Sequence, residues 1–94
     1  MYFAIICVDK PGMSAVRSEV RPKHLEYIGR FKNRMVAAGP LQTDDGDAML
    51  GSLLILDVAD RRAAEAFAGD DPYARAGLFD SVVIRRWHKV MPAD

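Results

Sequence analysis

The side chains best suited to move a proton lie in two short stretches, one around His24 and one around Asp71. A histidine changes its protonation state near neutral pH, and a neighbouring carboxylate orients the ring and stabilises its charged form. Residues 69–77 combine an Asp, a Pro and a closing Gly, which predicts a very short helix. Asp71 would be its N-cap, Pro72 its first residue and Gly77 its left-handed stop. A cap explains Asp71 by itself, so the case for a site depends on His24.

His24 is predicted to lie in the first turn of a long helix, at the edge of its apolar stripe. A histidine at such an edge is either a structural hydrogen-bonding residue or an acid–base group. The other histidine of the sequence is His88, and neither histidine belongs to a cluster with the spacing of metal ligands. We therefore predict no metal site.

The elements that must position these residues follow from hydrophobic runs and chain-breaking residues. Residues 2–8 form a short apolar run rich in β-branched and aromatic residues, which is typical of a strand. Pro22 disfavours helical angles at the preceding residue, so we expect residues 11–20 to be a loop and the long helix to begin at Pro22. Gly39 and Pro40 are expected to end it. The remaining predictions are a short extended piece at 41–43, a turn at 44–47, a strand at 48–58, a helix at 61–68 and a strand at 81–90.

This order predicts an α+β fold, the ferredoxin-like βαββαβ arrangement of a four-stranded antiparallel sheet with two helices on one face. The first and third predicted strands are apolar on both faces, although helices cover only one. An exposed apolar sheet favours association, so we expect a homodimer whose sheets meet face to face as a dimeric α+β barrel. Within the long strand, Gly51 indicates a bulge or a close backbone approach, and Ser52 places a hydroxyl beside it.

Size and composition restrict the class of protein. The 94 residues are enough for a single domain, expected to span 1–94. Acidic and basic residues balance at 13 each, which argues against nucleic acid as a partner. The one cysteine, Cys7, cannot form an internal disulfide, which fits a reducing cytoplasm. We expect no membrane span and no signal peptide, since no apolar run approaches ~20 residues.

Several motifs together resemble the YCII-related family over nearly the whole chain. They are Arg21-Pro22-x-His24-Leu25, Gly39-Pro40, Gly51-Ser52, Glu65-Ala66-Phe67 and Asp70-Asp71-Pro72-Tyr73-x-x-Ala76-Gly77. The resemblance implies a dimeric α+β barrel similar to that of muconolactone isomerases, and a His/Asp pair at its pocket that corresponds to His24 and Asp71. Phe67 stands where many relatives have Trp, a change that affects the shape of the pocket.

These residues predict a pocket at which His24 and Asp71 meet, with Arg21, Ser52 and Tyr73 as substrate-binding residues. Arg21 would bind an anionic group at the helix N-terminus, and Ser52 and Tyr73 would donate hydrogen bonds at the rim. The chemistry expected of such a pair is acid–base work without metal or cofactor, namely isomerisation or elimination of HX (a lyase or dehydrohalogenase reaction) on a small cyclic or aromatic metabolite. The alternative is a non-catalytic protein that binds a small ligand or serves as an accessory, in which the pair only pins the short turn. A free imidazole nitrogen beside an open pocket would favour the enzyme.

Overall fold

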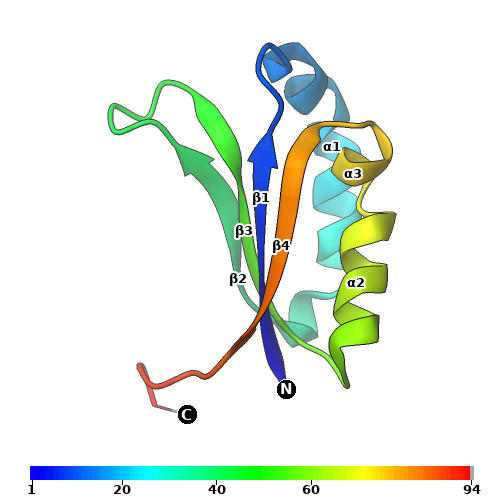
Figure 1. Ribbon diagram of the computed structural model, residues 1–94, viewed down its shortest axis with the longest axis vertical. Coiled ribbons are helices and arrows are strands. Elements are labelled where there is room, and N and C mark those ends of the chain that lie inside the picture. Colours follow the sequence, from blue (N-terminus) through cyan, green and yellow to red (C-terminus); the bar gives the residue numbers. More distant parts are fainter. Residues whose placement is uncertain (94) are drawn as a thin grey trace.

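The computed structural model describes residues 1–93, which form a four-stranded antiparallel sheet with the helices on one face (Figure 1). The strand order is β2-β3-β1-β4, so β2 and β4 are the edges. This is the predicted ferredoxin-like βαββαβ order, with one additional short helix; Asp94, the last residue of the expected domain, lies outside the described part. The elements are β1 (Tyr2–Asp9), α1 (Ser14–Gly29), the 3₁₀ turn η1 (Lys32–Arg34), β2 (Met35–Gln42), β3 (Met49–Asp57), α2 (Arg61–Asp70), α3 (Pro72–Arg75) and β4 (Phe79–Trp87).

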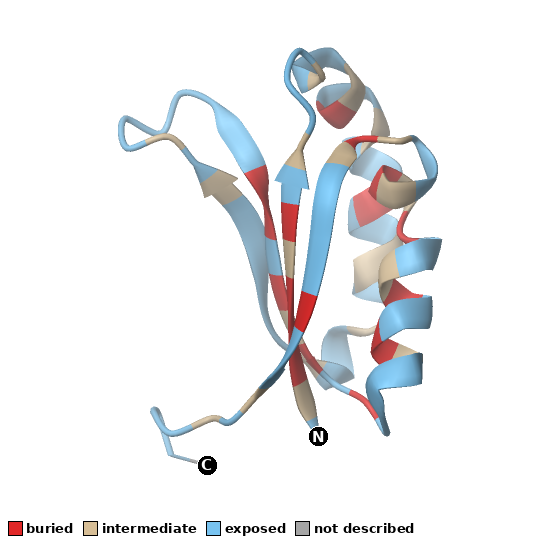
Figure 2. Ribbon diagram, in the orientation of Figure 1, coloured by how far each residue is buried: buried red, intermediate tan, exposed pale blue. Residues whose placement is uncertain are grey.

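The hydrophobic core lies between the two central strands and α2. Alternate residues of β1 and β3 point to the helix-covered face, where Ile5 pairs with Leu54 and Phe3 with Leu56, and Phe67 of α2 belongs to the same buried cluster. Figure 2 marks the buried segments of the central strands and of α2 in red. Complete burial of a side chain of this size contributes roughly 1.5–3 kcal/mol. Helix α2 packs on β1 and β4, whereas α1 makes its main contacts with α3. The sheet beneath α1 is therefore only partly filled, which leaves room for a site.

The first helix begins earlier than the sequence predicted. The expected loop at 11–20 is wrong, because α1 starts at Ser14 and contains Pro22 in its interior. A proline inside a helix removes one hydrogen bond and costs about 3 kcal/mol. Here Pro22 and Ser18, whose carbonyl loses its usual partner, are both exposed, so water can satisfy the freed carbonyl. Tertiary contacts of Arg17 and His24 hold the helix across the proline.

The predicted extent of that helix to residue 38 is also wrong. Helix α1 ends at Gly29, and Met35–Gln42 forms β2 instead. Gly39 and Pro40 lie within this strand, where Pro40 pairs with Ser52 of β3. Proline is tolerated there because β2 is an edge strand, so a missing backbone donor need not interrupt a ladder on both sides. The expected extended piece at 41–43 is the end of this longer strand.

The turns were predicted more accurately than the first helix. A tight connection joins β2 to β3, and Gly46 in it has φ +78°, as expected of the acidic turn at 44–47. Gly51 makes the predicted close approach, since a Cβ there would overlap the carbonyl of Cys7 on β1. Asp60 caps α2 by accepting a hydrogen bond from the Ala63 amide. Helix α2 runs through Gly69 to Asp70, past the expected end at residue 68, and β4 covers 79–87 where 81–90 was expected.

One face of the sheet carries no helix (Figure 1), and the residues at its centre are apolar. Ile6 lies between Leu53 of β3 and Val83 of β4, and Ala4 lies beside Ile55. Leu53 and Val83 are each more than a third exposed. In the described residues, no helix combines the length and the apolar character needed to cross a membrane.

Candidate active site

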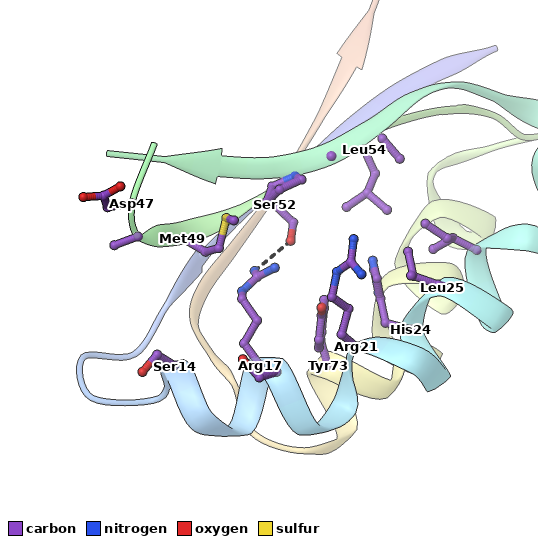
Figure 3. Close-up of a pocket in the computed structure, with 16 residues that line it drawn as sticks. Ser14, Arg17, Arg21, His24, Leu25, Asp47, Met49, Ser52, Leu54 and Tyr73 are labelled. Carbon is purple, nitrogen blue, oxygen red and sulfur yellow. Dashed lines mark hydrogen bonds between the residues drawn. The ribbon is translucent and has the colours of Figure 1, made fainter. Parts of the chain in front are cut away.

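A cavity of about 590 Å³ lies between α1 and the strands β2 and β3. Helix α1 presents Arg17, Arg21, His24 and Ile28 at intervals of four, three and four residues, which places them along one face of the helix. Figure 3 shows Arg17, Arg21 and His24 of this row facing β3, with Ser52 on the strand. The cavity is therefore on the helix-covered side of the sheet, opposite to the apolar uncovered face. Its remaining lining residues are Ser14, Ser18, Leu25, Ala38, Gly39, Pro40, Asp47, Ala48, Met49, Leu54 and Tyr73.

The structure brings His24 and Asp71 into direct contact at the inner end of this cavity. His24 Nδ1 and Asp71 Oδ1 are 2.9 Å apart, and both side chains are more than nine-tenths buried. The short helix α3 holds Asp71 in place, because Oδ1 of Asp71 also accepts a hydrogen bond from the Tyr73 amide at 2.9 Å. Pro72 follows as the first helical residue, and Gly77 takes φ +72° after the helix, as the sequence predicted.

This contact determines which imidazole nitrogen faces the cavity in its basic form. An ionised carboxylate only accepts hydrogen bonds, so Nδ1 of His24 carries the proton and Nε2 carries a lone pair. Within residues 1–93, Nε2 has no hydrogen-bond partner, and no side-chain nitrogen or oxygen is buried without one. Nε2 is thus accessible from the cavity that His24 lines. The arrangement is that of a general base with a carboxylate behind it.

Tyr73 fixes the imidazole ring from the side. The two rings are stacked, with their centroids 4.0 Å apart and an angle of 18° between their planes. Tyr73 is 1% exposed, and burial raises the pKa of its phenol, an effect that the charges of Arg17 and Arg21 oppose only in part. The phenol therefore stays protonated near neutral pH and remains a hydrogen-bond donor.

Arg17 is the site residue that the sequence analysis missed. It is 6% exposed, its guanidinium donates to both carboxylate oxygens of Asp9 at 2.7 and 2.9 Å, and it donates to Ser52 Oγ at 2.9 Å. The guanidinium carbon also lies 4.6 Å from the centre of the Tyr73 ring (Figure 3). Burial disfavours its charge, but the hydrogen bonds and charge of Asp9 outweigh this and raise the pKa of Arg17. Arg17, Arg21 and His24 are spaced as residues on one face of a helix. The sequence analysis did not recognise this spacing because it began the helix at Pro22, which left Arg17 in a loop.

The other predicted binding residues lie at the cavity, though not all where they were expected. Arg21 is exposed and lines the cavity, but it lies inside α1 and not at the helix N-terminus, so the helix dipole contributes little at its position. Ser52 is 3% exposed and accepts a bond from Arg17, so it belongs to the cavity wall and not to the rim. Among residues 1–93, no three His, Cys, Asp or Glu side chains gather in a way that could hold a metal ion.

Fold and site together define a class: ferredoxin-like α+β proteins with a buried His–Asp pair at a cavity beside the sheet. Comparison with known proteins is more specific, since the model of the YCII-related domain matches residues 1–88. The chain belongs to the YCII-related family. It is 31% identical over 97 residues to Protein YciI of Escherichia coli and, to the same extent, to an uncharacterised protein of Haemophilus influenzae, and each alignment covers 96% of this chain and 99% of the relative.

One solved structure supports the same assignment, and a second shares the fold. The chain is similar to 5-chloro-2-hydroxyhydroquinone dehydrochlorinase (TftG) of Burkholderia phenoliruptrix, solved in complex with 2,5-dihydroxybenzoquinone. The TM-score is 0.90 at 31% identity, with both chains covered completely. SnoaB, a cofactor-independent oxygenase of Streptomyces nogalater, matches with a TM-score of 0.56 at 16% identity over 98% of this chain and 95% of its own. The second likeness shows the fold alone.

Proposed function

We propose that this protein is an enzyme in which His24 acts as the general base on a small cyclic or aromatic metabolite, with Asp71 behind it. The observation that carries the proposal is the geometry of His24: Nδ1 is bound to Asp71, while Nε2 is accessible from the cavity without a protein partner. A residue that served only to pin the α3 turn would need no such free nitrogen. The free nitrogen therefore favours catalysis over the alternative of a non-catalytic binding or accessory protein.

Two reactions are compatible with one base in this position. In an isomerisation, His24 takes a proton from one atom of the ring and returns it to another, so the substrate keeps its composition. In an elimination, the bonding pair of a C–H group becomes the new π bond, the C–X pair leaves with X as halide, and the proton remains on His24 until water removes it. Asp71 stabilises the imidazolium that forms in either case, and neither step draws on an oxidant or a reductant.

The likeness to TftG favours the elimination. That protein is a dehydrochlorinase acting on a chlorinated hydroxyhydroquinone, and it aligns with the whole of this chain at 31% identity. The cavity of about 590 Å³ is large enough for a substituted six-membered ring. Arg21, Tyr73 and Ser52 are proposed as the residues that contact the substrate, as the sequence analysis expected, with Ser52 acting from the wall.

Turnover of a defined panel tests the proposal. Wild-type protein is assayed with halogenated hydroquinones, for released halide, and with unsaturated cyclic ketones, for changes in ultraviolet absorbance. His24→Gln should lower kcat by about 10²–10⁴-fold, the usual contribution of a positioned base. His88→Gln is the matched control, because His88 is exposed beyond the end of β4 and outside the cavity. Equal turnover by wild type and His24→Gln, or no turnover on the whole panel, would contradict the proposal.

We also propose that two chains associate through the uncovered face of the sheet. The support is the apolar centre of that face, where Ile6, Leu53 and Val83 lie side by side with two of them over a third exposed. Apolar patches of this kind favour association between proteins. The cavity on the opposite face stays open to ligand in such a dimer.

A further inference from the structure

We infer that the ligand of this cavity is a ring carrying an ionised oxygen, and that Arg21 is the residue that selects this charge. The inference rests on the proposed function and adds the class of substrate to it. It follows from the different surroundings of the two arginines that α1 presents to the cavity, Arg17 and Arg21.

The positive charge of Arg17 is already compensated by the carboxylate of Asp9 and is not available to a ligand. Asp9 takes hydrogen bonds from its Nε and one terminal nitrogen, at 2.7 and 2.9 Å, and the side chains of the pair are only 8% and 10% exposed. Ser52 accepts a further bond, and the guanidinium lies over the ring of Tyr73. A buried ion pair of this quality is fixed, because removing either partner leaves an uncompensated charge. Arg17 therefore builds the cavity wall and supports the Tyr73–His24 stack.

Arg21 is one helical turn further along and has no such partner. Within residues 1–93 it makes no hydrogen bond or ion pair, although it lines the cavity and points into it (Figure 3). Figure 3 shows its guanidinium beside the rings of Tyr73 and His24 that form the site. Arginine donates in a planar fork that matches a pair of oxygens, and it is always charged. An exposed guanidinium that no carboxylate pairs in residues 1–93 is suited to an anion, and Asp47, the exposed carboxylate of the lining, lies at the opposite end of the cavity (Figure 3).

The proton balance of the proposed reaction leads to the same ligand. In the proposed isomerisation, the proton that His24 Nε2 takes from a ring carbon leaves its electron pair on the ring, where a conjugated carbonyl oxygen holds it as an oxyanion, and an imidazolium forms on the protein. Asp71 compensates the imidazolium, and Asp9 already compensates Arg17, so Arg21 is left to compensate the oxyanion. The rest of the lining is largely apolar, including Leu25, Ile28 and Leu54, and suits the body of a ring. Acidic hydroxyquinones and related enols are the ligand class that combines these features.

A pair of probes that differ only in charge tests this. The ionisable probe is 2,5-dihydroxybenzoquinone, and its dimethyl ether is the probe that cannot ionise; binding is measured by calorimetry at pH 7 and low salt. Wild type should bind the ionised probe at least about tenfold more tightly than the ether, since hydrogen bonds to charged groups are the stronger ones. Arg21→Gln should lose most of that preference while its affinity for the ether changes by less than about threefold. Arg21 is exposed, and thermal unfolding of the variant checks that it folds.

The matched control is Lys23→Gln, which removes the same charge two residues along α1 and outside this cavity. It should bind both probes as wild type does. Equal loss of both probes in Arg21→Gln, equal affinity of wild type for the two, or binding of neither would overturn the inference. His24→Gln separates it from the proposed function: if that variant keeps the preference for the ionised probe and also keeps turnover, Arg21 still selects the anion while His24 is not the base.

Discussion

Replacing Asp71 by Asn removes the charge behind His24 while leaving the shape of the site intact. Oδ1 of Asp71 accepts both the bond from His24 Nδ1 and the bond from the Tyr73 amide, each at 2.9 Å. An asparagine oxygen in that place can accept both, so the cap of α3 and the orientation of the imidazole are kept. The change therefore isolates the contribution of the carboxylate charge to the step in which His24 becomes positively charged.

The size of the effect follows from these contacts. A hydrogen bond to a charged group contributes about 1.5–3 kcal/mol, and a neutral one about 0.5–1.5 kcal/mol. Losing the charge-assisted bond to the imidazolium should therefore lower turnover by roughly 5–50-fold, at about 1.4 kcal/mol for each factor of ten. The free energy of unfolding should fall by no more than about 1 kcal/mol, since both bonds survive in neutral form. Asp71→Ala should instead lose about 2–4 kcal/mol of stability, because a cap is removed and the Nδ1 proton is left buried without a partner.

Three measurements check this reasoning: turnover on the substrate found in the panel, urea unfolding, and a long-range proton–nitrogen NMR spectrum of the His24 ring. Asp70→Asn is the control, because Asp70 is the adjacent carboxylate but is exposed and pairs with Arg75. It should leave turnover unchanged. Wild-type turnover in Asp71→Asn would refute the role of the charge. An NMR spectrum with Nε2 protonated in wild type at neutral pH, and Nδ1 bare, would refute the tautomer.

Three further predictions concern the scaffold. Gly51→Ala should lower the free energy of unfolding by about 1–3 kcal/mol or more in urea titrations, because its Cβ meets the Cys7 carbonyl, whereas Gly29→Ala, where a Cβ meets nothing within 4 Å, should not destabilise. Burial raises the pKa of the Cys7 thiol from 9.0 to about 12, so between these values only the unfolded chain releases the proton and stability falls as pH rises. Cys7→Ser should make the fall in the free energy of unfolding with pH less steep, by up to about 1.4 kcal/mol per pH unit, in urea titrations between these pH values. The same pH dependence in the variant would contradict the raised pKa of Cys7. Light scattering at micromolar concentration should give twice the 10.4 kDa chain mass, and Leu53→Glu should give the single mass; a wild-type monomer would rule out association through this face.

The sequence predicted the features that local chemistry determines. The Asp-Pro start and the Gly end of α3, the glycine turn between β2 and β3, and the close approach at Gly51 each depend on what one residue type allows its backbone to do. The extent of α1 was wrong because Pro22 and Gly39 normally mark helix ends, and tertiary contacts overrode that preference at both places. Residues 35–38 are compatible with helix or strand, and only pairing with β3 decides between them.

The contact between His24 and Asp71 could be expected even though the helix start was misplaced, because it depends on topology. Helix α1 packs on α3, so a residue in the C-terminal half of α1 meets the turn after α2 wherever α1 begins. The role of Arg17, in contrast, depends on where α1 begins. It reaches Asp9 and Ser52 only if α1 extends back past Pro22, and the same contacts help to hold the helix together across that proline. The buried ion pair and the early helix start are thus one feature of the molecule. Because Arg17 is paired, Arg21 is, within residues 1–93, the arginine of α1 that lines the cavity without a carboxylate partner.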